Sequence, residues 1–294
     1  MANDPQEQGN TYILNPEDAT EMARLMHQDR LVTKYMGGLF PGGPDLSAMH
    51  DILDVACGPG GWVLDVAHEY PKAQVVGMDI SRKMTSYARA QAQSQGLDNA
   101  RFLVMNALQP LDFPAKSFDL VNARLMGAFM PRDAWPSVLQ ECMRIVRPGG
   151  IIRLTELDIG CVTTNLACET MDNLVLRATY LEGKSFSPTG RSTGLVAMLA
   201  RLLRHAGCVN VQQRPHLIDF SAGTEAHEAC YQNAIVFYQL IKPFLIKMGV
   251  TTPQEFDQLY QQVLIEMLSD DFCGMWLLLN AWGQKPATPS HQEA

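Results

Sequence analysis

The sequence contains no run rich in lysine or arginine, and only 18% of its 294 residues are charged. Its 23 basic and 31 acidic side chains give a net charge of −8. A nucleic acid, whose backbone phosphates need a basic surface, is therefore not an expected partner. We attribute the negative charge itself to solubility.

Paired cysteines and long apolar runs are also missing. The seven cysteines, an odd number, include no C-x-x-C pair, as a disulfide framework or a zinc site would require. No apolar run is long enough to span a bilayer, and the N-terminal MANDPQEQGN is too polar for a signal peptide. We therefore expect a soluble, cytoplasmic protein with reduced thiols, no metal site and no membrane contact.

From residue 51 onward, apolar β-branched runs alternate with amphipathic segments. The strand-like runs are 51–56, 74–79, 101–105, 118–123 and 150–157. The helix-like segments are 61–70, 82–95 and 134–146, with Ser81 and Asp133 as N-caps. The third strand reaches the fourth without a convincing helix. This alternation predicts an α/β protein with a doubly wound, mostly parallel sheet.

Helical patterns dominate the rest of the chain. They cover 161–182, 192–206 and 224–268, the last containing a capping box at Thr252. Strand patterns cover 208–221 and 272–283. A further helix is expected from an N-cap at Asn15 to about Tyr35, before the glycine-rich loop 37–44. The first ten residues and the tail are polar enough to be disordered.

The run ILDVACGPGGWVLDVA, residues 52–67, passes from a strand through glycines into a helix. In an open parallel sheet the ligand lies beyond the carboxyl ends of the strands, and glycine lets it approach the backbone. Asp79 ends the next strand, where an acid can accept hydrogen bonds from both ribose hydroxyls. Gly58, Gly60 and Asp79 together indicate a nucleoside.

Three further residues distinguish between nucleoside ligands. A dinucleotide pyrophosphate needs free N–H groups, but Pro59 removes one from the turn and Asp54 adds a carboxylate. Ala56 also replaces the first glycine of G-x-G-x-x-G. S-adenosylmethionine, with adenosine at one end and two positive groups at the other, suits this turn better. A nicotinamide-dependent oxidoreductase is the less favoured enzyme.

The glycine turn and three later motifs resemble class I S-adenosylmethionine-dependent methyltransferases, in particular the ubiquinone/menaquinone-biosynthesis-like small-molecule methyltransferases. The later motifs are VVGMDIS (75–81), RFLVMNALQPLDFPAKSFDLVNARLMGAFMP (101–131) and LQECMRIVRPGGIIRLTELD (139–158). The resemblance covers roughly residues 50–160 and is specific, because four motifs occur in order. It implies a Rossmann-like, seven-stranded sheet with an antiparallel last strand, plus helical lid insertions.

The resemblance also implies a site for S-adenosylmethionine, which would leave as S-adenosylhomocysteine. The residues implied are Asp54, Ala56, Gly58 and Gly60 around the methionine part, Asp79 at the ribose, Ile80 and Met84 on adenine, Asn106 and Ala107 at the adenine edge, and Asn122, Ala123 and Arg124 beneath the sulfonium. Two residues depart from the family pattern. Ala56 replaces the usual glycine, and Asn106 stands where aspartate is common, although its carbonyl can still accept from the adenine amino group.

On this reading the chain divides into seven parts. They are an N-terminal helical cap (1–44), the S-adenosylmethionine-binding core (45–160), a lid insertion (161–190), a core helix and strand (191–220), a second, helical lid insertion (221–271), the last core strand (272–284) and a disordered tail (285–294).

Methyl transfer is an in-line displacement from a donor that is already activated, so positioning and desolvation can supply much of the rate. A base is needed only if the acceptor must lose a proton. Glu156 and Asp158 are the candidate bases, and Tyr12 could close over the methyl donor. Arg124 could bind a substrate carboxylate, but a pair with Glu156 is the simpler expectation.

The 16 methionines, many in the cap segments, suggest an adaptable apolar cavity. We therefore expect a small, apolar or aromatic acceptor. A non-catalytic S-adenosylmethionine-binding regulatory module is the alternative from another class, because binding motifs and turnover are separate properties. The apolar N-terminal helix could also dock on a second copy, which would make a homodimer.

Overall fold

The computed structural model describes residues 11–287. The first ten residues and residues 288–294 lie outside the described residues, so the disorder expected there is not tested. Residue 285, the first of the expected tail, is held in place, because the Lys285 ammonium donates to the carbonyl oxygens of Met143 and Val146 at 2.5 and 2.8 Å. No helix in the described part of the chain is long and apolar enough to cross a membrane.

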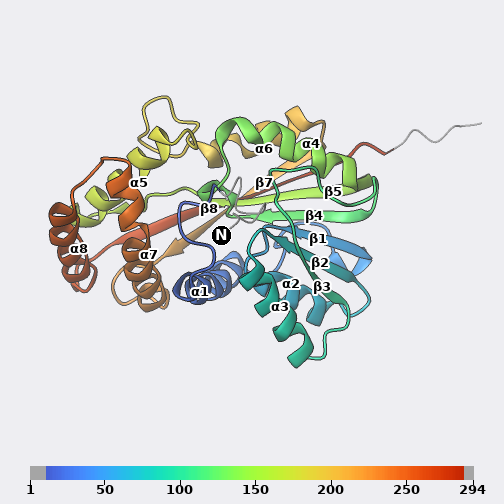
Figure 1. The fold of residues 1–294 in the computed structure, drawn as a ribbon, viewed down its shortest axis with the longest axis horizontal. Helices are drawn as coiled ribbons and strands as arrows, with labels where there is room; N and C mark the ends of the chain where they lie inside the picture. The colour runs from blue at the N-terminus through green and yellow to red at the C-terminus, as the bar shows by residue number, and fades with distance from the viewer. Residues whose placement is uncertain (1–10, 288–294) are drawn as a thin grey trace, which may run out of the picture.

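One mixed sheet runs through the molecule in the order β3-β2-β1-β4-β5-β8, with β6 and β7 both paired to β8 (Figure 1). Its strands are β1 Asp51–Val55, β2 Gln74–Asp79, β3 Ala100–Val104, β4 Phe118–Arg124, β5 Val146–Leu157, β6 Val162–Thr163, β7 Val209–Asp219 and β8 Gly274–Gln284. The first five are parallel, and β8 pairs antiparallel with its neighbours. The expected mostly parallel sheet with an antiparallel last strand is confirmed, and the two-residue β6 is an eighth strand beyond the seven expected.

Eight α-helices are found within residues 11–287. They are α1 Ala19–Met36, α2 Gly61–Glu69, α3 Arg82–Ser94, α4 Trp135–Ile145, α5 Leu166–Leu181, α6 Leu195–Ala206, α7 His227–Lys247 and α8 Pro253–Met267. No helix joins β3 to β4, as expected.

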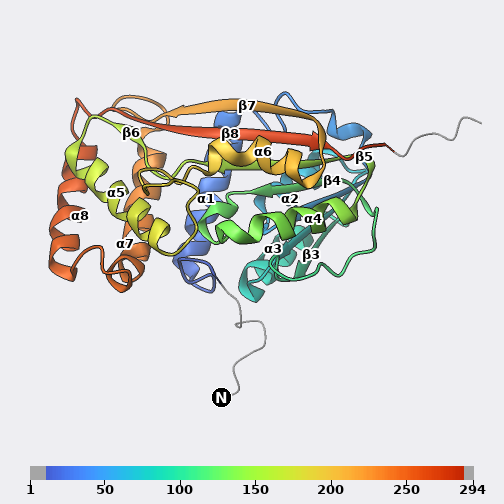
Figure 2. The same cartoon turned by 90° about the horizontal axis from the view of Figure 1, so that it is seen from above.

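The helices cover the sheet in three groups (Figures 1 and 2). α2 and α3 pack on one face, where Trp62 and Val63 are buried against β1 and β2. α4 and α6 pack on the other, where Trp135 and Leu199 are buried. α1, α5, α7 and α8 form a third core at one end of the sheet. The apolar side chains Leu31 and Val32 of α1 are buried in this third core.

The third core has a surface to pack on because β7 and β8 extend beyond the other strands of the sheet (Figure 2). β8 pairs with β5 only from Leu278 to Gln284, whereas it pairs with β7 back to Met275. The antiparallel pair of β7 and β8 therefore projects past the carboxyl end of β5. We call α5, α7 and α8, which pack on this projection, the end helices.

Two helix starts that were expected from the sequence are wrong. Asn15 does not cap α1; its side chain accepts from the Glu17 N–H in a local turn, and Asp18, in an extended conformation, caps the helix by accepting from Thr20 N–H at 2.7 Å. Asp133 does not cap α4, because it lies inside a short 3₁₀ turn (Arg132–Ala134) and lacks the extended backbone of an N-cap.

The expected helical stretch 224–268 is two helices. α7 ends at Lys247, after which Gly249 adopts a left-handed conformation with φ 67°. The Thr252–Glu255 capping box then starts α8, with Pro253 as its first residue, as the sequence indicated.

Candidate functional site

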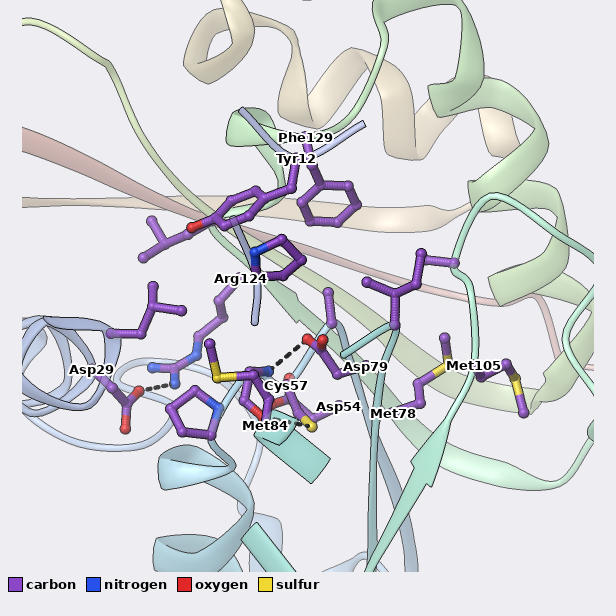
Figure 3. A pocket seen from close by; sticks show the side chains of 18 of the residues that line it. Tyr12, Asp29, Asp54, Cys57, Met78, Asp79, Met84, Met105, Arg124 and Phe129 are labelled. Carbon is purple, nitrogen blue, oxygen red and sulfur yellow. Dashed lines mark hydrogen bonds and ion pairs between the residues drawn. The ribbon is translucent and has the colours of Figure 1, made fainter. Parts of the chain in front are cut away.

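A cavity of about 140 Å³ lies beyond the carboxyl ends of β1, β2 and β4, covered by α1 and the segment before it (Figure 3). We call it the first cavity. Its lining includes Tyr12, Leu25, Gln28, Asp29, Asp54, Ala56, Gly58, Asp79, Ile80, Met84, Asn106, Ala107, Arg124, Leu125 and Phe129. Figure 3 shows Tyr12 and Phe129 on one side and Asp54 and Asp79 on the other.

Three residues of the turn between β1 and α2 have left-handed backbones: Ala56 (φ 57°), Gly58 (φ 54°) and Gly60 (φ 83°). A Cβ on Gly58 would meet only Leu25, at 3.9 Å, so the space above this residue is open to the cavity. A Cβ on Gly60 would come within 2.6 Å of Phe102 and 2.8 Å of Ala88. Gly58 thus provides ligand access, whereas Gly60 lets α2 pack and does not line the first cavity.

Asp79 holds the same turn from the neighbouring strand. One oxygen accepts from Gly58 N–H and the other from Ser81 N–H, both at 2.9 Å. Burial raises the pKa of this carboxyl. Each oxygen retains acceptor capacity for a ligand hydroxyl, because a carboxylate offers about four such positions.

The wall beside Asp79 is largely apolar. Ile80, Met84 and Ala107 line it, together with Met105, which the sequence had not indicated. Asn106 also lines it, but its side-chain oxygen accepts from Leu108 N–H at 2.9 Å, so one of its lone pairs stabilises the loop. These residues form a largely apolar wall with one amide group, the kind of surface on which a nucleobase packs.

Asp54 is buried where β1 meets the cavity, and it accepts from the Asn122 amide at 2.7 Å. Burial raises the pKa of Asp54 to about 7, although the nearby Arg124 lowers it. Asn122 and Ala123 are buried in β4 and are not among the residues lining the cavity. Asn122 therefore contacts Asp54 rather than the ligand space.

The Arg124 guanidinium forms an ion pair with Asp29 of α1, donates to Thr33 at 3.2 Å, and lies 5.8 Å from the centre of the Trp62 ring. The expected pairing with Glu156 is therefore wrong. The reason is tertiary: α1 docks across the end of β4 and brings a carboxylate directly to the guanidinium.

Tyr12 lines the first cavity, and its closing over a methyl donor stays a prediction. Its ring lies edge-on to Phe129, with 6.4 Å between the centroids, and its hydroxyl donates to Glu21 at 2.6 Å. Glu21 in turn accepts two hydrogen bonds from Arg24, both at 2.7 Å. The segment is held further by Thr11, whose hydroxyl donates to the Phe129 carbonyl.

A second cavity of about 130 Å³ adjoins the first. The two share Tyr12, Leu25, Gln28 and Leu125 as a common wall. The rest of its lining includes Leu14, Arg24, Gly127, Glu156, Leu157, Ile159, Asp172, Leu195, Asn233, Ala234, Phe237, Tyr238 and Trp276. The second cavity thus lies between the end of β5 and the end helices.

Glu156 lies near the carboxyl end of β5 and lines the second cavity. Its two oxygens accept from the N–H groups of Met126 (2.7 Å) and Gly127 (3.2 Å). Burial raises its pKa to about 8, even though both of these hydrogen bonds lower it. Asp158, the other candidate base, does not line either cavity and accepts from the Thr193 hydroxyl at 2.6 Å.

Sequence reasoning missed the α1 residues of the site and the polar side chains of the end helices. Leu25, Gln28, Asp29 and Val32 recur at helical spacing, so one face of α1 covers the first cavity. That periodicity was visible in the sequence. Asp172, Asn233 and Tyr238 carried no local signal, because they meet only when α5 and α7 pack together.

The Rossmann-like fold is shared with methyltransferases of known structure. The chain superimposes on phosphoethanolamine N-methyltransferase 2 of Haemonchus contortus, solved with phosphomonomethylethanolamine and S-adenosylhomocysteine, with a TM-score of 0.52. The sequence identity is 16%, and the match covers 92% of this chain and 58% of that one.

Residues 52–150 match the family described as a methyltransferase domain. Methyltransferase str2 of Strobilurus tenacellus is 32% identical over 50% of this chain and 49% of its own length. Nocamycin O-methyltransferase of Saccharothrix syringae is 29% identical over 66% and 72%. Demethylmenaquinone methyltransferases also match.

Residues 52–150 therefore match a methyltransferase domain, in the same part of the chain as the motifs that resemble class I S-adenosylmethionine-dependent methyltransferases. The match spans about half the length of the first of these curated relatives.

Proposed function

We propose that the protein transfers the methyl group of S-adenosylmethionine, bound in the first cavity, to a small, largely apolar or aromatic acceptor bound in the second. The observation that carries this proposal is the shared wall. Two cavities of similar size meet at Tyr12, Leu25, Gln28 and Leu125, which suits two reactants whose reacting atoms must come together.

The first cavity fits S-adenosylmethionine at both ends. The open space above Gly58 admits the methionine part, and Asp54 provides negative charge near its ammonium group. Asp79 accepts from the ribose hydroxyls, and Ile80, Met84, Asn106 and Ala107 hold adenine. When bound, the cofactor supplies a methyl group on a sulfonium that needs no further activation.

The chain's own residues position the reactants and exclude water. Tyr12 and Phe129 cover the first cavity, so the displacement takes place away from bulk solvent. Glu156 serves as the base that accepts a proton from the acceptor, and its raised pKa suits that role near neutral pH. Arg124, paired with Asp29, closes the methionine end.

Neither alternative reading gains support. A dinucleotide pyrophosphate would meet Asp54 and Pro59 in the turn, and a pure S-adenosylmethionine-binding module has no use for a second cavity with a buried carboxylate. The argument for a homodimer also weakens, because the apolar side chains of α1 are buried within the same chain. The homodimer and the cytoplasmic location stay predictions.

Methyl-labelled S-adenosylmethionine provides the test. The purified protein is incubated with it and a fractionated small-molecule extract, and the label is followed. Label in a low-mass product supports the proposal and identifies the acceptor. Tight binding of the cofactor without any transfer would favour the binding module instead, and no binding would show that the glycine turn has been misread.

A further inference from the structure

The second cavity carries a polar pair that the methyl-transfer proposal does not use. Asp172 of α5 and Tyr238 of α7 both line this cavity and are both buried. The Tyr238 hydroxyl donates to one Asp172 oxygen at 2.8 Å, and Cys161 N–H donates to the other at 2.8 Å. The pair joins two of the end helices.

A purely structural pair would not need a carboxylate here. An asparagine could accept from Cys161 N–H through its oxygen and donate to the Tyr238 hydroxyl through its nitrogen. It would do so without the cost of burying a charge. Burial raises the pKa of Asp172; when it is ionised, the hydrogen-bonding positions left over on both Asp172 and Tyr238 are acceptors.

Glu156 presents the same chemistry at the reacting end. Both of its oxygens already accept from backbone N–H groups, so its remaining positions are also acceptors when it is ionised. The second cavity therefore offers hydrogen-bond acceptors at two separate places.

Within the described residues, the one basic group lining the cavity is already paired with a carboxylate. Arg24 is the only basic side chain among the described residues that line it. Its Nε and Nη2 donate to Glu21, and its Nη1 donates to Gln28 and Asn233 at 3.0 Å. The amide groups of Gln28 and Asn233 can serve a carbonyl oxygen but carry no charge.

Building on the proposed function, we infer that the methyl acceptor carries no negative charge and has two hydrogen-bond donor groups. One, the group that is methylated, faces Glu156, and the other binds Asp172 and Tyr238. A hydroxyl or an amine meets this requirement, and a phosphorylated or carboxylated acceptor does not. During transfer the acceptor atom bonds to the methyl carbon, the sulfur–carbon bond breaks, and the acceptor's proton passes to Glu156.

The first test sorts acceptors by charge. A small-molecule extract is separated at pH 7 into neutral, cationic and anionic fractions before each is incubated with methyl-labelled S-adenosylmethionine and the full-length protein. Label taken up by the neutral or the cationic fraction supports the inference, and the labelled product then shows whether a hydroxyl or an amine was methylated. Label taken up by the anionic fraction alone overturns the inference.

If S-adenosylmethionine binds but no fraction is labelled, the proposed function itself fails, which is a separate outcome. Binding of the cofactor, measured by calorimetry, distinguishes these cases. The active fraction then becomes the probe for the second test.

The second test changes the polar pair. Tyr238→Phe, which removes one hydroxyl, and Asp172→Asn, which preserves the internal hydrogen bonds, should each raise the KM for the active fraction about tenfold. Cofactor affinity should stay unchanged. Glu169→Gln, an exposed acid on the same helix as Asp172, is the matched control. Unchanged KM in both variants of the pair would refute its role in acceptor recognition.

Discussion

Replacing Glu156 by glutamine should make the fold more stable in alkaline solution while removing turnover. The pKa of Glu156 rises from 4.5 to about 8 in the folded protein because of burial. Between these pH values the folded chain keeps this proton and the unfolded chain loses it. Glu156 therefore lowers the free energy of unfolding as pH rises from about 4.5 to about 8.

The size of the effect follows from the same shift. At about 1.4 kcal/mol per pKa unit, the loss has an upper limit of about 5 kcal/mol. Glutamine has no titratable proton and escapes this loss, although it forfeits one backbone hydrogen bond worth about 1 kcal/mol at every pH. The free energy of unfolding of Glu156→Gln, relative to wild type, should therefore rise by about 3–5 kcal/mol between pH 4 and pH 9.

Urea denaturation of both proteins across this range measures the difference, and pH-independent contributions cancel in the comparison. Glu169→Gln, the same change at an exposed position, should show only a small dependence. A difference between wild type and Glu156→Gln that stays constant from pH 4 to pH 9 would refute the reasoning. Glu156 would then not be a base with a pKa near neutrality.

Three other predictions concern the same site. If Glu156 accepts the acceptor's proton, wild-type kcat should rise about tenfold per pH unit below pH 8 and level off above it; a flat profile would remove this role. Asp79→Ala should weaken S-adenosylmethionine binding by about 1–3 kcal/mol in calorimetry, and unchanged affinity would contradict the ribose assignment. Gly60→Ala should destabilise the fold by about 2–4 kcal/mol, through backbone strain and contact with Phe102. Gly96→Ala, strained but with open space around it, should cost only about 1–2 kcal/mol, and equal losses would exclude the packing role of Gly60.

The first cavity was readable from the sequence because its acids and glycines sit at strand ends. Strands of a parallel sheet end at one edge, so residues 54, 58 and 79 had to converge once the βαβ pattern was recognised. The same argument could not show that Gly58 faces the cavity and Gly60 does not. Which of two neighbouring left-handed glycines faces a ligand depends on whether Phe102 and Ala88 fill the other side.

The second cavity was only partly predictable. The end helices do pack beside it, although their role as a lid stays a prediction. Arg124 of the first cavity shows the same limit, because its partners depend on how α1 lies across the sheet. Asp29 and Arg124 are far apart in sequence, and no local pattern links them. The caps failed for a related reason: Asn15 and Asp18 are both good capping residues, and only the backbone geometry decides which one starts the helix.

Because β7 and β8 project past β5, the two cavities rest largely on different parts of the fold, and these parts can change independently in evolution. On the proposed function the cofactor lies at the ends of β1, β2 and β4, whereas much of the acceptor's surroundings belongs to the projecting β7–β8 pair and the three end helices. Substitutions in this overhang would then change which molecule is methylated without disturbing the strands that bind the cofactor. A chimaera exchanging the overhang between relatives would inherit its acceptor from one parent and its methyl donor site from the other.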